Sequence, residues 1–207
     1  MKKKIILIHL FFAVISLGIK YYQVSGPDLV WNMFLALVAF DFAALVYFVK
    51  QPIVKLFLAL FWFFFYPNTF YMLTDIVHMN FTSTVLWEKT SLILYMLFVS
   101  SILFGVLSGT ESVKVMFKSF KVTSYPLRLA LICALSVISS FAIHIGRYAR
   151  LNSWDILTRP KVVIDELASV WSTGTAAYFV LGFTFLQILT LVFLEDETLL
   201  YIPISEW

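Results

Sequence analysis

The stretch LVWNMFLALVAFDFAALVYFV, residues 29–49, decides the class of this protein. It is apolar along nearly its whole length, and Asp41 is its only charged residue. A helix that crosses the hydrocarbon core of a bilayer needs roughly 20 consecutive apolar residues. We therefore predict that residues 29–49 form a transmembrane helix.

Further apolar runs of similar length predict further transmembrane helices. Their approximate bounds are 5–24, 53–74, 90–108, 127–148 and 174–194. These runs lack the alternation of apolar and polar residues that marks a barrel strand. The first run resembles a signal peptide but has no small-residue cleavage site before Lys20, so we expect it to be retained. The prediction is an all-α, polytopic membrane protein of about six transmembrane helices, forming a single integral membrane domain over residues 1–207.

The composition of the chain supports this class. Of the 207 residues, 61% are hydrophobic and only 13% are charged, about half the charged share of a soluble domain. A soluble globule of this length could not bury so many apolar side chains, which excludes secreted enzymes, cytosolic enzymes and nucleic-acid-binding modules. The single cysteine, Cys133, excludes an internal disulfide and a cysteine-based zinc site.

The distribution of basic residues predicts the orientation in the membrane. With the N-terminus in the cytoplasm, nine Lys and Arg residues lie on the cytoplasmic side and six outside, as the positive-inside rule requires. An even number of helices then places the C-terminus in the cytoplasm as well. Between helices five and six, residues 161–171 read KVVIDELASVW, a pattern that suits a short helix lying in the membrane interface.

Polar residues gather at the predicted outer end of helix three. Residues 66–78 read YPNTFYMLTDIVH, with a proline that can kink the helix. At 100° per residue, Asn68, Tyr71, Asp75 and His78 fall within an arc of about 80°. Polar groups inside a membrane are costly and mark functional sites.

The pair Asp75 and His78 allows three interpretations, because residues three apart are neighbours on a helix. The carboxylate could orient a histidine base or help to bind a ligand. The two side chains could form half of a divalent metal site. They could also be a simple ion pair at the end of the helix.

A second polar group lies at the predicted outer end of helix five, where residues 144–155 read HIGRYARLNSWD. His144 and Arg147 are again three apart. Helices three and five both run from inside to outside, so we expect their polar ends at the same depth. Arg147 and Arg150 suit the recognition of a carboxylate or phosphate, or they snorkel to lipid phosphates. Asp155 is a candidate partner for them.

The first two predicted helices also carry polar residues. Asn32 could donate a hydrogen bond into the outer cluster or make a simple contact between helices. Asp41, in the middle of helix two, could be protonated or paired with a polar group such as Gln187 in helix six, and a role in proton relay is open. We expect His9, near the inner end of helix one, to have a structural role.

Three of these segments resemble the signature blocks of a protein family. They are residues 31–36 (WNMFLA), 66–78 (YPNTFYMLTDIVH) and 146–155 (GRYARLNSWD). They resemble an uncharacterised family of small bacterial multi-pass membrane proteins catalogued as domain of unknown function 1361, over nearly the whole chain. One departure is that helix two continues past Asp41 without the proline often found in the family. The resemblance implies a bacterial plasma-membrane protein and no established activity.

The first functional hypothesis is an enzyme at the extracytoplasmic face that acts on a lipid or lipid-linked anionic substrate by hydrolysis or group transfer. The candidate catalytic residues are Asp75, His78 and His144, which are also the candidate ligands of a divalent metal. The candidate substrate-binding residues are Asn32, Asn68, Tyr71, Arg147, Arg150, Asn152 and Asp155. The expected partners are membrane lipids, with a lipid head group or a small anion as ligand.

The alternative is a non-enzymatic transporter, receptor or accessory subunit that binds a small anion or an amino acid. A third interpretation is a structural membrane protein whose polar cluster only stabilises the fold. A continuous polar path through the membrane would favour transport, whereas a closed outer cavity would favour an enzyme or receptor.

Overall fold

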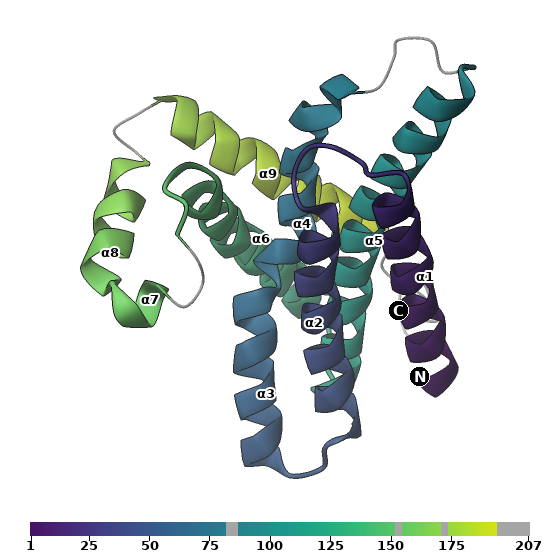
Figure 1. The fold of residues 1–207 in the computed structure, drawn as a ribbon. Helices are drawn as coiled ribbons and strands as arrows, with labels where there is room; N and C mark the ends of the chain where they lie inside the picture. The colour runs from purple at the N-terminus through teal and green to yellow at the C-terminus, as the bar shows by residue number, and fades with distance from the viewer. Residues whose placement is uncertain (82–86, 152–154, 171–173, 194–207) are drawn as a thin grey trace, which may run out of the picture. The chain divides into compact units, whose positions relative to one another are not determined.

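The computed structural model describes residues 1–81, 87–151, 155–170 and 174–193, and within these ranges the chain is helical and contains no strand (Figure 1). The elements are α1 (Lys2–Tyr21), α2 (Leu29–Phe48), α3 (Pro52–Phe65), α4 (Pro67–Tyr71), the 3₁₀ helix η1 (Met72–Phe81), α5 (Lys89–Ser119), α6 (Tyr125–Tyr148), α7 (Asp155–Thr158), α8 (Pro160–Ser169) and α9 (Gly174–Phe193).

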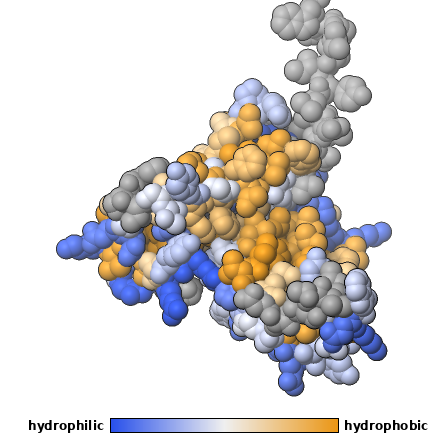
Figure 2. Space-filling view, turned by 90° about the horizontal axis from the view of Figure 1, so that it is seen from above, coloured by the Kyte–Doolittle hydropathy of each residue, from blue (hydrophilic) through white to orange (hydrophobic). Residues whose placement is uncertain are grey.

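Six segments of the described chain are long and apolar enough to cross a membrane, which confirms the number predicted from hydropathy. They are α1, α2, the combined segment Pro52–Met79, α5, α6 and α9. Many large hydrophobic side chains of these segments are exposed, as expected for helices in contact with lipid, among them Leu10, Leu17 and Leu56. Hydrophobic side chains are also visible on the face seen in Figure 2. The cytoplasmic location of the termini stays a prediction.

The fourth predicted helix was too short, because α5 continues to Ser119 rather than ending near residue 108. The extension carries charged residues, so hydropathy does not count it as part of a membrane span. Glu and Lys are nevertheless good helix formers, and the helix therefore continues. One of them, Glu111, is paired with Lys4 of α1, with 2.6 Å between Oε1 and Nζ. Two residues after the helix ends, Lys121 adopts a positive φ of 54°.

The chain divides into two compact units, Met1–Val113 and Lys114–Trp207, and each is described by itself. The single integral domain stays a prediction. In the first unit, α2 packs beside α1, α3 and α4 (Figure 1). Its small residues Ala36, Ala39 and Ala43 are fully buried, which lets the neighbouring helices approach closely.

In the second unit, α6 and α9 form an antiparallel pair. Gln187 of α9 is fully buried and its Nε2 donates to Ser140 Oγ at 2.8 Å and to Ser136 O at 3.3 Å. Nearer the other end of α9, Phe179 contacts the ring of His144. Sliding α9 along α6 would break the hydrogen bonds of the Gln187 amide and leave a polar group unpaired in the membrane, which is costly. These bonds therefore hold the two helices in register.

A short helix follows α6 and α7 in the second unit, as the sequence predicted. It spans Pro160–Ser169 rather than 161–171, and its Val163 packs against Ile145 of α6 and Leu151. Proline is favoured at the first position of a helix, where its missing N–H has no intrahelical partner to lose. The interfacial location of α8 stays a prediction.

Candidate functional site

The polar end of the third span begins at a break in the helix. Helix α3 ends at Phe65 and α4 begins at Pro67. The Asn68 Nδ2 donates to Phe65 O at 3.0 Å, and the Thr69 Oγ1 donates to Tyr66 O at 2.7 Å. These side chains satisfy carbonyl oxygens at the break, which membrane-embedded backbone requires. Asn68 therefore supports the break, and its role in substrate binding stays a prediction.

Beyond Tyr71 the chain is a 3₁₀ helix, so the continuous α-helical arc predicted for Asn68, Tyr71, Asp75 and His78 is wrong. A 3₁₀ helix has three residues per turn, and side chains three apart are eclipsed. Asp75 and His78 consequently still share one face of η1, whereas Asn68 and Tyr71 belong to the α-helical turn before it. The Thr74 hydroxyl donates to Tyr71 O at 2.7 Å and supports this tighter winding. Ten residues of 3₁₀ helix is an unusual length, and such stretches often mark functional hinges.

The carboxylate of Asp75 is held by a side chain from another helix. Asp75 is only 1% exposed, and Asn32 Nδ2 of α2 donates to its Oδ2 at 2.8 Å. Asn32 thus joins α2 to the end of the third span, which fits both alternatives that the sequence left open for it. Its role in substrate binding stays a prediction. His78 and Tyr71 are half-buried on the same segment. The first unit thus holds a buried, oriented carboxylate with a histidine one 3₁₀ turn further on.

In the second unit, His144 lies among aromatic rings. It is 9% exposed, and its ring centroid lies 4.7 Å from that of Tyr148 and 5.4 Å from that of Phe179. Arg147, one turn on from His144, is half-buried. Sequence reasoning missed both aromatic neighbours. The spacing of four residues could have identified Tyr148, but nothing in the sequence connects Phe179 to this position.

The acidic residue after α6 has a partner that sequence reasoning also missed. Asp155 is 3% exposed, and its Oδ1 accepts hydrogen bonds from Arg159 Nη2 at 2.8 Å, Arg159 Nε at 3.1 Å and Thr158 Oγ1 at 3.2 Å. The i, i+4 spacing of Asp155 and Arg159 was visible in the sequence. Asn152 lies outside the described residues.

A divalent metal at Asp75, His78 and His144 stays a prediction, as does the joining of the two polar clusters into one site. Among the residues that the structure describes, no group of three or more His, Cys, Asp or Glu side chains is placed to hold a metal ion.

Asp41 has a different partner from the one expected. Its Oδ2 lies 3.3 Å from the Nε2 of His9 on α1, a partner that sequence reasoning missed when it suggested a polar group such as Gln187. Gln187 makes its hydrogen bonds within the second unit, to Ser136 and Ser140. The His9 Nδ1 is 2.9 Å from the carbonyl oxygen of Ile5, which orients the imidazole toward α2.

Arg150 adopts a positive φ of 53° directly after the end of α6. This left-handed conformation costs an ordinary residue roughly 1–2 kcal/mol but costs glycine almost nothing. We expect R150G to be more stable than R150A by about 1 kcal/mol, because both lose the guanidinium and only glycine relieves the backbone. Thermal unfolding of the two purified variants measures this difference, and equal stabilities would contradict the strain.

Six apolar helices with polar residues grouped at helix ends define the architecture of a helical multi-pass membrane protein. The family model described as "Protein of unknown function (DUF1361)" matches residues 31–190, and the chain belongs to this family. The resemblance seen in the three sequence blocks is thereby confirmed. No curated protein and no solved structure matches the chain.

Proposed function

We propose that this protein acts on a membrane lipid or lipid-linked anionic substrate, by hydrolysis or group transfer, at the extracytoplasmic ends of its helices in the plasma membrane. The observation that carries the proposal is the 2.8 Å hydrogen bond from Asn32 to Asp75, whose carboxylate is 1% exposed. A buried ionisable group in a membrane-spanning segment is costly and is usually functional.

The chemistry follows from the placement of Asp75 and His78 on one face of η1. His78 is the general base, and Asp75 orients its imidazole and stabilises the imidazolium that forms. His78 takes a proton from water, or from an acceptor hydroxyl, as that oxygen bonds to the phosphorus or acyl carbon of the substrate. The bond to the leaving oxygen breaks, and this oxygen receives the proton from His78.

For the second unit, we propose an anion-binding role for Arg147 and Arg150 at the end of α6. Guanidinium groups match the geometry of phosphate and carboxylate oxygens. His144, packed against Tyr148 and Phe179, is proposed as a second base or ligand beside them.

The test is the turnover of defined lipids by the full chain. The protein is reconstituted into vesicles of phosphatidylethanolamine and phosphatidylglycerol, and lipid products are followed by mass spectrometry. We expect D75N and H78Q to reduce the rate of product formation about 100-fold or more, since general acid–base groups contribute 10²–10⁴-fold. E88Q is the matched control, because Glu88 is an exposed acid just before α5, and it should keep the rate of the natural chain.

The choice of D75N separates catalysis from folding. An amide oxygen at position 75 can still accept the hydrogen bond from Asn32, so the thermal stability should change little while turnover is lost. Absence of any new lipid species with the natural chain, or undiminished turnover by D75N, would exclude the proposed enzyme.

The second candidate function is transport, favoured by pairs of ionisable side chains within the first unit. His9 and Asp41 lie 3.3 Å apart, and Lys4 and Glu111 lie 2.6 Å apart. Both pairs join α1 to another span, and ionisable groups within spans are typical of proton and ion pathways. In the same vesicles, uptake of inorganic phosphate that is lost in D41N, without a lipid product, would favour the transporter.

A further inference from the structure

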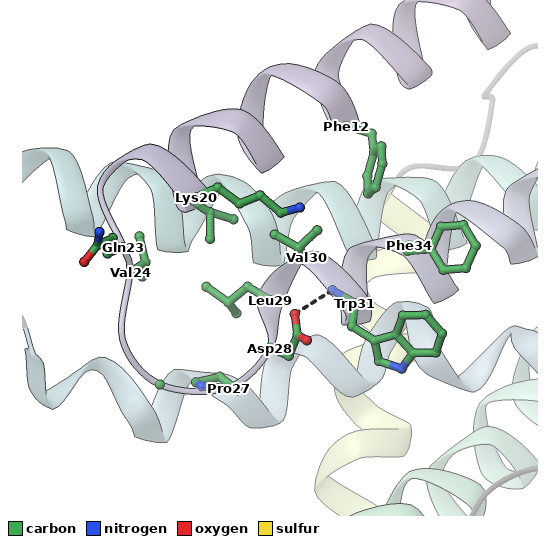
Figure 3. A pocket seen from close by; sticks show the side chains of 12 residues that line it. Phe12, Lys20, Gln23, Val24, Pro27, Asp28, Leu29, Val30, Trp31 and Phe34 are labelled. Carbon is green, nitrogen blue, oxygen red and sulfur yellow. Dashed lines mark hydrogen bonds between the residues drawn. The ribbon is translucent and has the colours of Figure 1, made fainter.

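An open groove of about 610 Å³ lies between the C-terminal end of α1 and the N-terminal end of α2 (Figure 3). It belongs entirely to the first unit and does not include Asp75 or His78. The lining residues used below are Phe12, Lys20, Gln23, Asp28, Val30 and Phe34.

The polar end of the groove is shaped by two well-defined helix ends. Helix α1 ends in a Schellman motif, in which Val24 N–H donates to Ile19 O at 3.1 Å and Gln23 has a φ of 48°. Helix α2 begins with Asp28, whose Oδ1 accepts a hydrogen bond from Trp31 N at 2.9 Å. The loop between them is therefore preformed rather than dependent on a ligand.

The groove changes from polar to apolar along its length. Lys20, Gln23 and Asp28 lie at the loop end. Phe12 is eight residues before Lys20 on α1, which is roughly 12 Å at 1.5 Å per residue. Trp31, beside the polar end, is 53% exposed, as expected for an aromatic residue at the level of lipid head groups. The order of side chains along the groove therefore matches that of a bilayer, in which a polar interface is followed by hydrocarbon.

Lys20 is the cation at the polar end. Within the described ranges, no ion pair engages its ammonium group. Figure 3 shows its side chain extended over the groove toward Phe12 and Val30 rather than into the loop. A cation at the membrane interface attracts the anionic phosphate of a lipid head group. The carboxylate of Asp28 already caps α2.

We propose that this groove is a binding site for a membrane phospholipid. The head-group phosphate contacts the ammonium of Lys20, and one acyl chain lies against Phe12, Val30 and Phe34. A lipid is the occupant that matches the order of chemistry, with a cation at the interface followed by apolar side chains at hydrocarbon depth. The residues that line the groove include no histidine. The proposed lipid site therefore does not depend on the proposed enzymatic function.

Native mass spectrometry of the full chain in detergent, titrated with dioleoylphosphatidylglycerol, tests the site. We expect K20Q to weaken lipid binding about fivefold, since a basic residue at the membrane surface contributes about 1 kcal/mol. K20R should bind like the natural chain. K89Q is the matched control, because Lys89 is an exposed lysine at the start of α5 in the same unit, and it should bind unchanged.

A second variant tests the apolar part without altering charge. V30F places a larger side chain in the groove and should reduce lipid binding at least tenfold while the melting temperature is retained. Equal binding by the natural chain, K20Q and V30F would overturn the proposal. Displacement of the lipid by inorganic phosphate at the same concentration would also overturn it, because the ligand would then be a free anion. Loss of lipid binding when the chain forms dimers would overturn it as well, because a second copy of the chain would then occupy the groove.

Discussion

Replacing Gly109 by alanine is expected to destabilise the first unit by about 1–3 kcal/mol, the usual cost of overpacking a buried contact. Gly105 and Gly109, one helical turn apart on α5, form the surface on which α4 and the start of η1 rest. A Cβ added at Gly109 would lie 2.8 Å from Thr69 Cβ and 3.2 Å from Phe70 Cε2. Small residues at such spacing let membrane helices approach closely.

Thr69 cannot easily move to relieve this contact. It is fully buried, and its hydroxyl donates to Tyr66 O at 2.7 Å at the break between α3 and α4. Moving Thr69 would uncover a backbone carbonyl in the membrane. Gly105 is constrained in the same way, since a Cβ there would lie 2.6 Å from Met72 Sδ and 2.8 Å from Thr69 O.

The control for this experiment is G182A in α9. A Cβ at Gly182 would meet no atom within 4 Å, and alanine is the better helix former by about 1 kcal/mol. Thermal unfolding in detergent should show G109A less stable than the natural chain and G182A equally stable or more so. If G109A melts at or above the temperature of the natural chain, the close approach of α4 to α5 is wrong.

Removing Asn32 should cost about 1.5–3 kcal/mol of stability, the range for a hydrogen bond to a charged group. Asn32→Ala takes away a donor that lies 2.8 Å from the buried Asp75 carboxylate. The two residues are 43 positions apart in the chain, so the loss also weakens the attachment of η1 to α2.

A double-mutant cycle separates this contact from other effects. The variants N32A, D75A and the double variant are unfolded under the same conditions, and a coupling free energy of roughly 0.5–3 kcal/mol is expected for residues in contact. Strictly additive losses would contradict the contact. As a control, T190A removes a hydroxyl that only donates to Leu186 O in its own helix and should change stability little.

The membrane-spanning segments and their polar ends could be predicted because they depend on local composition. A run such as 29–49 is apolar enough to specify a span whatever surrounds it. The sequence also placed Asn32 and Asp75 near the same end of their spans, where polar groups are not easily left unpaired, but it left open whether the two side chains meet.

Other features depended on contacts that no local pattern encodes. The winding of residues 72–81 into a 3₁₀ helix differs from an α-helix by only a fraction of a residue per turn, and apolar composition fits either. The pairing of Asp41 with His9 depends on the packing of α1 beside α2. Several polar residues in other spans could have paired with the Asp41 carboxylate equally well.

Hydropathy alone therefore established the class of this protein, the number of its spans and the places where polar groups collect, because the bilayer imposes the same requirement on every segment. Tertiary packing decided which polar groups meet and how tightly. Asp75 is held by Asn32, and α4 rests on Gly105 and Gly109, because these contacts are made between segments far apart in the chain. A residue's own neighbours in sequence carry no information about that proximity.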